Sequence, residues 1–589
     1  GHGRLAVCGA GRILVHMTTF SLSAAGFGAC RVLSAAALCL SLAAETAAAQ
    51  RPSGGARPAN AATTTPITEA DLRSRLFRIT DDSTMGRESG SAGAFSATAY
   101  VAGEFARLGL EPAGDNGTWF QVVPLWTVAV DPTSTLTSGA ESLVVFRDFL
   151  PGNSLAPARR FDGVDIVYAG STADTTNWIA PDAARGKVVL VHVPLGMPFR
   201  LATVQASRYR DAQALFIAAL DDVPAENTAR LRVGRPVADT SRNPRTIPIV
   251  YIARAAAARI LGGAPASRAP GATGGALRGH VDFSRAPVPF AARNVVGILR
   301  GSDPVLRNQY LSLTAHNDHV GYDQSPVDHD SLRAFNTVMR PMGADSPVRR
   351  PSDGEWSRIR LILDSLRAIR KPRLDSIRNG ADDDGSGTAS MLEIAEALAG
   401  MPVKPKRSIL FVSHTGEEAG LLGSRWFSDH PTVPIDSIVG EIDQDMVGRG
   451  TATDFPRSGT GAGGDTYLEV IGAKRISREF GEYLERANAK QLKPFVFDYT
   501  FDTPGHPLQY YCRADHYSYA RYGIPAVAFS RGEHQDYHQV TDEAQYISYP
   551  DLARVSRMVY DAALLIGNAA TRPARDVPKP SDPNAPCRQ

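Results

Sequence analysis

The pattern of apolar and polar positions changes at about residue 292. From there on, short apolar runs alternate with longer amphipathic stretches. The runs predict strands at 310–315, 408–412, 437–442, 467–471 and 526–529, and the stretches predict helices at 386–398, 417–427, 477–487 and 550–566. This alternation indicates an α/β sheet sandwiched by helices. In such sheets, sites form at the strand ends and in the loops beyond them.

Before residue 292 the chain shows two other patterns. Residues 68–110 have the spacing of amphipathic helices, and Thr68 stands where a cap is expected. From about 120 to 290 the pattern is one of short β-type runs separated by Gly, Pro and Asp, which predicts a separate small β-rich domain. Later, residues 323–378 form a long polar insertion with one predicted helix at 356–369. Insertions of this length beside a site are often lids or specificity elements.

Both ends of the chain are predicted to lie outside the folded domains. Met17 is the expected start, so residues 1–16 are an upstream extension. The apolar stretch after Arg31 ends in small residues at 47–49, as a secretory signal peptide does, so residues 1–49 predict export to a periplasmic or extracellular location. The alternative is a disordered Ala-rich terminus. Residues 50–67 predict a disordered linker, and the Pro-rich residues 571–589 predict a disordered tail.

The composition excludes some kinds of partner but does not indicate a reaction. A chain of 589 residues, 43% hydrophobic and 21% charged, fits two globular domains. A formal net charge of +2 gives no reason to expect nucleic acid, and no segment after the leader is apolar enough for stable membrane insertion. Cys512 and Cys587 remain after the leader and form no metal-binding cluster. They could pair, but Cys587 is expected to stay mobile in the tail.

Polar motifs stand at the predicted strand ends of the α/β part. They centre on His316 with Asp318, the acidic run 382–384, the pair Glu417-Glu418, Asp445 with its neighbour Asp443, and His538. Taken singly, each has an ordinary explanation, such as a polar strand end, a helix cap or solvated glutamates. Three adjacent carboxylates nevertheless repel one another and favour a cation, and a histidine ligand needs a nearby carboxylate to orient it. Together the motifs predict a metal site.

The glutamate pair indicates the reaction. Adjacent residues at a helix start project about 100° apart, so Glu417 and Glu418 are expected to serve different atoms. One can bind a metal ion while the other faces a water molecule. Hydrolysis needs this division, because a Lewis acid lowers the pKa of water and a base takes its proton. No Gly-x-Ser-x-Gly motif is present, which argues against a serine hydrolase.

In this order, the motifs resemble those of the co-catalytic zinc aminopeptidases, the superfamily that also contains glutamate carboxypeptidase and the transferrin receptor. The resemblance covers residues 68–130 and 290–570, and residues 131–289 resemble the protease-associated domain inserted in many members. It implies a three-layer α/β/α zinc-peptidase domain with a mixed central sheet, plus the inserted β-rich domain.

The resemblance also implies roles for the polar residues. Two Zn²⁺ ions, for which Mn or Co could substitute, would be bridged by Asp383. The other ligands would be His316 and Asp445 for one ion, with Asp443 as second choice, and Glu418 and His538 for the other. Glu417 would be the general base and Asp318 would support His316. Tyr511 would stand near the oxyanion, with Tyr510 as its competitor.

The activity implied is removal of N-terminal residues from peptide substrates. Three alternatives stay open: a carboxypeptidase or dipeptidase on the same core, a glutaminyl-cyclase-like enzyme, and a non-catalytic receptor-like binding module. The retained His316 argues mildly against the cyclase, which generally resembles a one-metal version of this site. The sequence does not predict the oligomeric state.

Overall fold

The computed structural model of the chain describes residues 63–152, 156–195, 197, 208–223, 225–238, 246–347, 349–449, 464 and 466–589. The chain divides into two units, 1–61 and 62–589, and every described residue belongs to the second. The predicted signal peptide at 1–49 and most of the predicted linker at 50–67 therefore lie outside the described residues. None of the helices in the described ranges combines the length and apolarity that a membrane crossing requires.

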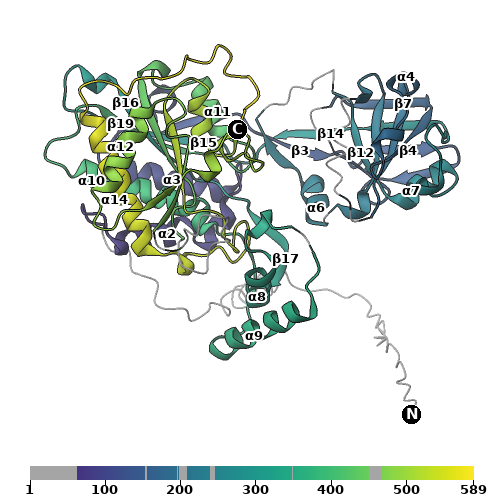
Figure 1. Ribbon diagram of the computed structural model, residues 1–589, viewed down its shortest axis with the longest axis horizontal. Coiled ribbons are helices and arrows are strands. Elements are labelled where there is room, and N and C mark those ends of the chain that lie inside the picture. The colour runs from purple at the N-terminus through teal and green to yellow at the C-terminus, as the bar shows by residue number, and fades with distance from the viewer. Residues whose placement is uncertain are drawn as a thin grey trace, which may run out of the picture. The chain divides into compact units, whose positions relative to one another are not determined.

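A nine-stranded sheet forms the centre of the α/β domain (Figure 1). Its order is β1–β15–β19–β16–β20–β23–β21–β22, and β2 also pairs with β15. The strands are β1 (Glu111–Pro112), β2 (Phe120–Val123), β15 (Ala292–Leu299), β16 (Tyr310–His316), β19 (Ser408–His414), β20 (Ile438–Gln444), β21 (Tyr467–Ile471), β22 (Val496–Asp498) and β23 (Ala526–Ser530). β19, β16, β20 and β23 run parallel, whereas β15 and β21 are antiparallel to β19 and β23. The expected mixed sheet is confirmed.

Each face of the sheet has its own core, because side chains alternate along a strand. Leu311 and Leu313 of β16 join a cluster with α2 (Glu69–Ile79), α3 (Ala92–Arg107), α10 (Gly387–Ala399), α12 (Arg478–Ala489) and α14 (Tyr549–Asn568). Leu410 and Val412 of β19 join a second cluster with α11 (Leu422–Asp429) and α13 (His516–Ala520). Helices on both faces give the expected three layers; Figure 1 shows α10 and α14 beside β16 and β19.

The predicted strands and helices of this domain are present, with one exception. The helix predicted at 417–427 begins only at Leu422. Gly416, Gly420 and Leu421 have φ values of 73°, 107° and 60°, so residues before α11 form a loop of left-handed turns. Glu417 and Glu418 lie in this loop. Their separation therefore comes from the loop and not from helical spacing, and the helical argument is wrong at this point.

The helical pattern predicted for 68–110 is confirmed by α2 and α3. Thr68 caps α2, because its hydroxyl accepts a hydrogen bond from the Asp71 amide at 3.1 Å. The fold begins slightly earlier than expected. The Thr63 hydroxyl donates to Glu396 at 2.6 Å, so the end of the predicted linker already contacts α10.

Residues 126–287 form a β-rich insertion between β2 and β15. Its strands are β3 (Trp126–Val130), β4 (Thr135–Ser138), β5 (Glu141–Val144), β6 (Phe149–Pro151), β7 (Arg159–Val164), β8 (Ile166–Ser171), β9 (Val188–His192), β10 (Ala214–Ala218), β11 (Arg235–Val237), β12 (Ile249–Ile252), β13 (Leu277–Val281) and β14 (Phe283–Pro287). They build sheets of five, four and three strands, with α4 (Pro181–Ala184), α6 (Ala225–Val233) and α7 (Arg254–Leu261). β3 pairs with β14, so the insertion includes residues before the predicted boundary at 131.

The predicted polar insertion at 323–378 holds more structure than one helix. It consists of β17 (Tyr322–Asp328), α8 (His329–Met339), α9 (Asp353–Ile369) and β18 (Leu374–Ile377), and β17 pairs with β18. Its base is tied to the segment that follows β23: His329 Nε2 lies 2.9 Å from Glu543 Oε2, and Arg333 donates to Asp536 at 2.8 Å. The Ala344 amide donates to the Tyr537 carbonyl at 3.0 Å. The insertion thus contacts the residues next to His538.

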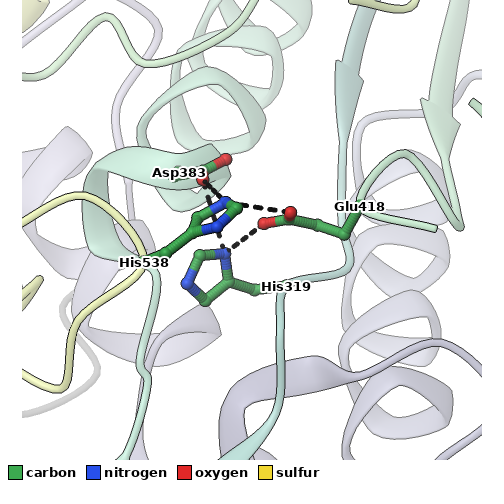
Figure 2. Close-up of side chains that lie close together, drawn as sticks. All are labelled: His319, Asp383, Glu418 and His538. Carbon is green, nitrogen blue, oxygen red and sulfur yellow. Dashed lines mark ion pairs between the residues drawn. The ribbon is translucent and has the colours of Figure 1, made fainter. Parts of the chain in front are cut away.

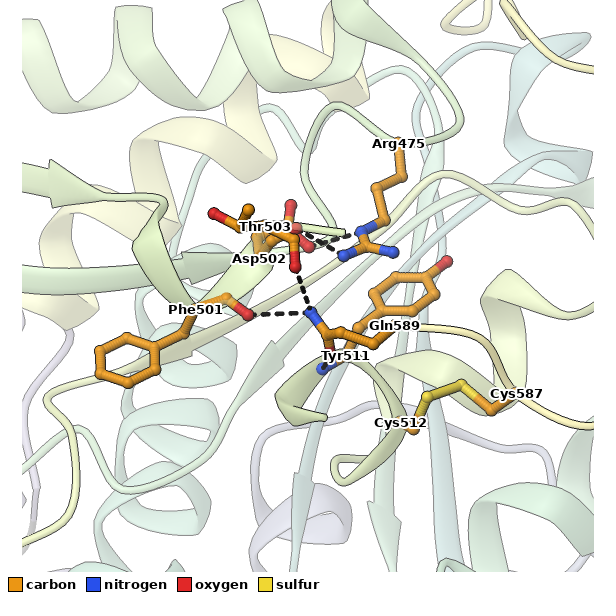
Figure 3. Close-up of a disulfide and its surroundings, with 8 residues drawn as sticks. All are labelled: Arg475, Phe501, Asp502, Thr503, Tyr511, Cys512, Cys587 and Gln589. Carbon is orange, nitrogen blue, oxygen red and sulfur yellow. Dashed lines mark hydrogen bonds and ion pairs between the residues drawn. A yellow bond between two sulfur atoms is a disulfide. The ribbon is translucent and has the colours of Figure 1, made fainter. Parts of the chain in front are cut away.

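The C-terminal residues 571–589 are packed against the α/β domain, so the prediction of a disordered tail does not hold. Cys587 forms a disulfide with Cys512, and Gln589 accepts from the Tyr511 amide at 2.9 Å while donating to the Phe501 carbonyl at 2.9 Å (Figure 3). The Asp576 amide also donates to the Ile476 carbonyl at 2.8 Å. Proline-rich composition suggested disorder, but a covalent link and specific hydrogen bonds hold this segment in place.

Candidate metal centre

The carboxyl ends of three neighbouring strands meet at one edge of the sheet. β16 ends at His316, β19 at His414 and β20 at Gln444, and these strands are mutually parallel. The loops beyond them begin with 317–319, 415–418 and Asp445. Because parallel strands end together, motifs far apart in the sequence are brought side by side. The loop after β23 adds His538.

Asp383 stands between the strand-end loops, and its two neighbours face elsewhere. The Asp384 carboxylate accepts hydrogen bonds from the amides of His316 at 3.1 Å and Gly387 at 2.9 Å. The Asp382 carboxylate accepts from the Gly448 amide at 2.6 Å and lies 3.2 Å from His534 Nε2. The acidic run is therefore divided: the outer two carboxylates fasten neighbouring loops, and Asp383 alone faces the histidines of the centre.

The first group of converging side chains contains His316, Asp383 and Asp445. His316 Nε2 lies 3.1 Å from Asp383 Oδ1 and 3.7 Å from Asp445 Oδ1. Asp443, the second choice for this position, lies outside the group, since its carboxylate accepts from the Thr314 hydroxyl at 2.9 Å. The geometry thus brings Asp445 rather than Asp443 to His316.

The second group contains His319, Asp383, Glu418 and His538 (Figure 2). His538 Nε2 lies 3.0 Å from Asp383 Oδ2 and 2.9 Å from Glu418 Oε2. His319 Nδ1 lies 2.7 Å from Glu418 Oε1 and 3.7 Å from Asp383 Oδ2. The sequence singled out three of these four side chains and missed His319. The only indication of His319 in the sequence was that a second histidine follows His316 by three residues.

The donor set fits metal ions. Nε2 of His316, Oδ1 of Asp445 and Oε1 of Glu418 are buried atoms without a hydrogen-bond partner among the described residues. Buried polar atoms normally have partners. His316 and Asp445 belong to the first group and Glu418 to the second, and within each group the ligand atoms lie within 4.8 Å of one another, which favours a cation in each. Imidazole nitrogens and carboxylate oxygens are ligands that zinc accepts.

The charges of the buried groups also favour a cation at this centre. Burial would lower the pKa of His538, but the carboxylates of Glu418 and Asp383 raise it to about 10. Burial would raise the pKa of Asp383, but its bonds to His316 and His538 hold it well below its usual range. The centre therefore strongly favours positive charge next to these carboxylates.

Glu417 and Asp318 stand beside the first group. Glu417 Oε2 lies 4.0 Å from His316 Nε2, and burial raises the pKa of Glu417 well above its usual range. Asp318 Oδ1 accepts from the Glu417 amide at 3.2 Å and lies 3.7 Å from His316 Nδ1. One carboxylate thus contacts both the histidine and the glutamate loop.

Tyr511, expected near the oxyanion, is not among the residues that line the cavity beside the metal centre. Its ring is held against the Arg475 guanidinium, 3.9 Å away, and faces His516. Tyr510 lines the cavity instead, together with Glu417 and Asp445. Gln509 has a φ of 53°, so the chain turns sharply just before these tyrosines, and Tyr510 rather than Tyr511 borders the cavity.

Arg87 is a structural member of the centre that the sequence gave no reason to single out. Its buried guanidinium donates to the carbonyls of Asn317 at 3.0 Å and Gly380 at 2.9 Å, and also to that of Asn379. It thus joins the loop after β16 to the segment that carries Asp383. Arginine is common in every protein, and only the fold brings this one to the centre.

Comparison with known proteins finds similarity in the α/β part. Residues 294–563 match the model of peptidase family M28. A probable zinc metalloprotease of Pyricularia oryzae is 28% identical over 222 residues, which cover 32% of this chain and 42% of that protein. Leucine aminopeptidase 1 of Coccidioides posadasii is 31% identical over 189 residues, covering 30% of this chain and 44% of that protein. The chain thus spans less than half the length of these curated relatives.

Solved structures are similar over a longer stretch. An aminopeptidase from Aneurinibacillus sp. strain AM-1 has a TM-score of 0.48 and 18% identity, covering 88% of this chain and 97% of that one. BSAP, a zinc aminopeptidase from Bacillus subtilis, has a TM-score of 0.47 and 18% identity, covering 85% and 95%. The matched residues 294–563 contain both groups of converging side chains, so the part of the chain that carries the centre is similar to peptidase family M28.

Proposed function

We propose that this chain is a two-metal peptidase that removes N-terminal residues from peptides. One observation carries the proposal: Asp383 presents one oxygen to each group. Its Oδ1 lies 3.1 Å from His316 Nε2, and its Oδ2 lies 3.0 Å from His538 Nε2. A carboxylate used from both sides in this way suits two ions held close together.

His316, Asp383 and Asp445 would hold one ion, and Asp383, Glu418 and His538 the other, with His319 beside the second. Zinc is the proposed metal, because nitrogen and oxygen ligands suit it and the Pyricularia oryzae relative is named "Probable zinc metalloprotease". Mn or Co could replace it. When bound, the ions would polarise the substrate carbonyl and lower the pKa of water.

Glu417 is the proposed general base. Glu417 borders the cavity beside the metal centre and is not needed as a ligand of either group. It would take a proton from the attacking water and deliver it to the leaving amine nitrogen. Asp318, through its contacts with the Glu417 amide and with His316 Nδ1, would keep both residues in position.

Two observations favour the aminopeptidase over the carboxypeptidase. Several relatives are named leucine aminopeptidase. A carboxypeptidase would also need a free cation for the substrate carboxylate, but Arg513 in this cavity already contacts Asp345 at 2.9 Å and Glu533 at 3.5 Å. We also propose that the protein is exported and that the insertion at 126–287 is a protease-associated domain. The Cys512–Cys587 disulfide supports export, since disulfides persist in oxidising compartments.

The proposal is tested with the purified, zinc-loaded chain. Leucine p-nitroanilide, its N-acetylated form and a peptide with an amidated C-terminus are offered with and without a chelator. An aminopeptidase cleaves the first and third and spares the second, and the chelator abolishes both cleavages. Cleavage that requires a free C-terminus would favour the carboxypeptidase. A chain that binds no metal and cleaves nothing would support the receptor-like alternative.

A further inference from the structure

The cavity beside the metal centre has an apolar wall and, besides the acids of the metal centre, the buried acid Glu533. Met446, Ile471 and Ala528 contribute to the wall, and Tyr510, Arg513 and Glu533 contribute polar groups. The cavity also borders Asp383, Glu417 and Asp445, so a molecule in it contacts the metal-binding residues. Its lining is therefore expected to meet the side chain of the residue being removed.

Glu533 is the unusual member of this lining. Its side chain is only 6% exposed. The Tyr510 hydroxyl donates to Oε1 at 2.7 Å, and Arg513 approaches the same oxygen at 3.5 Å. Oε2 is buried and has no hydrogen-bond partner among the described residues. A buried carboxylate oxygen without a partner is unfavourable, so its partner is expected to come from outside the chain.

The charge around Glu533 indicates which partner. Arg513 is the cation nearest to it, and that guanidinium also contacts Asp345. Glu469, a second buried carboxyl group, lies close enough for the charge of Glu533 to raise its pKa, and its Oε2 has no hydrogen-bond partner among the described residues. Burial raises the pKa of Glu533 to about 7, the Tyr510 bond lowers it, and Asp345 raises it. Acids outnumber bases here, so a cation would favour the charged form of Glu533.

We propose that Glu533 is a specificity-determining residue that accepts the ammonium or guanidinium group of an N-terminal lysine or arginine. The apolar wall would cover the aliphatic part of such a side chain, and the charged end would reach Oε2. A leucine side chain would fill the wall but leave Oε2 without a partner. This inference rests on the proposed peptidase activity and refines it to basic N-terminal residues.

The test compares kcat/KM for the p-nitroanilides of lysine, norleucine and leucine on the zinc-loaded chain, at a pH above the pKa of Glu533. Norleucine has the aliphatic chain of lysine without its charge. The wild type is expected to prefer lysine to norleucine by at least about tenfold, as a charge-assisted hydrogen bond in a buried site allows. Glu533→Gln should lose most of this preference, because kcat/KM for lysine p-nitroanilide should fall more than kcat/KM for the norleucine and leucine substrates.

Two further variants complete the design. Glu533→Leu should reverse the order and favour norleucine and leucine over lysine. Glu355→Gln removes a carboxylate that pairs with Arg349 on the exposed helix α9, and it should leave the preference as in the wild type. Thermal unfolding and zinc content are measured for every variant, so a folding defect is recognised separately.

The outcomes separate the two proposals. If no p-nitroanilide is cleaved by the zinc-loaded wild type, the peptidase proposal fails. If norleucine and leucine are cleaved but lysine is not preferred, only the role of Glu533 is overturned. If Glu533→Gln slows all three substrates equally, Glu533 contacts the α-amino group that they share, and the specificity proposal is likewise overturned.

Discussion

Nδ1 of His319 lies 2.7 Å from Oε1 of Glu418, so two loops that follow different strands contribute to the same end of the metal centre. His319 is fully buried, and its ring also faces that of His538 edge to face at 5.4 Å. The second group of converging side chains thus has four members instead of the three expected from the sequence.

His319→Ala is therefore predicted to weaken zinc binding at this end. Loss of a ligand, or of a group that orients one, typically lowers metal affinity about 10- to 100-fold. Zinc content after dialysis against graded chelator should fall from two ions to nearly one per chain. His430→Ala is the matched control, because His430 is exposed and stacks on Trp426 away from the centre. Equal zinc retention in both variants would remove His319 from the metal centre.

Glu417→Gln is predicted to keep the metal ions and lose the reaction. Glutamine is nearly the same size but cannot take a proton, and a positioned general base typically contributes about 10²- to 10⁴-fold to the rate. The measurements are kcat on leucine p-nitroanilide and zinc content by elemental analysis. Glu355→Gln again serves as a control for the loss of one half-buried carboxylate far from the metal-binding groups in sequence. A Glu417→Gln variant with full activity would show that another group takes the proton.

Arg87→Met is predicted to destabilise the fold around the centre. The substitution leaves the carbonyls of Asn317 and Gly380 buried without their donor. Each such carbonyl costs about 1–3 kcal/mol, so a loss of several kcal/mol in the free energy of unfolding is expected. Urea unfolding measures it, and Arg349→Met is the control because Arg349 pairs with Glu355 at the exposed surface. Similar unfolding midpoints for the two variants would contradict the role given to Arg87.

Features that depend on neighbouring residues were predictable from the sequence, whereas features that depend on contacts between distant segments were not. β16, β19 and β20 were predicted because apolar runs of strand length are local, and the polar residues that end them were found for the same reason. The start of α11 was predicted wrongly, because Leu421 adopts a positive φ and a leucine in the sequence does not indicate one. His319 and Arg87 were missed because their roles come from contacts between distant segments. The disulfide of Cys587 made the tail ordered, whereas its composition indicated the opposite.

Cys512→Ser is predicted to lower stability by freeing the C-terminal segment. The disulfide spans 75 residues of sequence, and closing a loop of that size typically stabilises a fold by about 2–4 kcal/mol. Since Cys512 directly precedes Arg513 in the cavity lining, KM should rise more than kcat falls. The same changes should follow when a reductant is added to the wild type. A reductant that shifts the unfolding of Cys512→Ser as much as that of the wild type would show that its effect does not come from this disulfide.

Glu469 is predicted to make stability fall as the pH rises. Burial raises the pKa of this carboxyl group to about 8, while an unfolded glutamate has a pKa near 4.5. The folded chain therefore holds a proton that the unfolded chain has released between these values. The contribution is fully present below about pH 4.5 and is lost as the pH rises through 8, by a few kcal/mol. Glu469→Gln keeps an acceptor for the Tyr467 hydroxyl, which donates to Glu469 at 2.9 Å, but has no proton to release. Urea unfolding across this pH range should show a steeper fall for the wild type than for Glu469→Gln, and parallel curves would mean that Glu469 does not titrate as its burial requires.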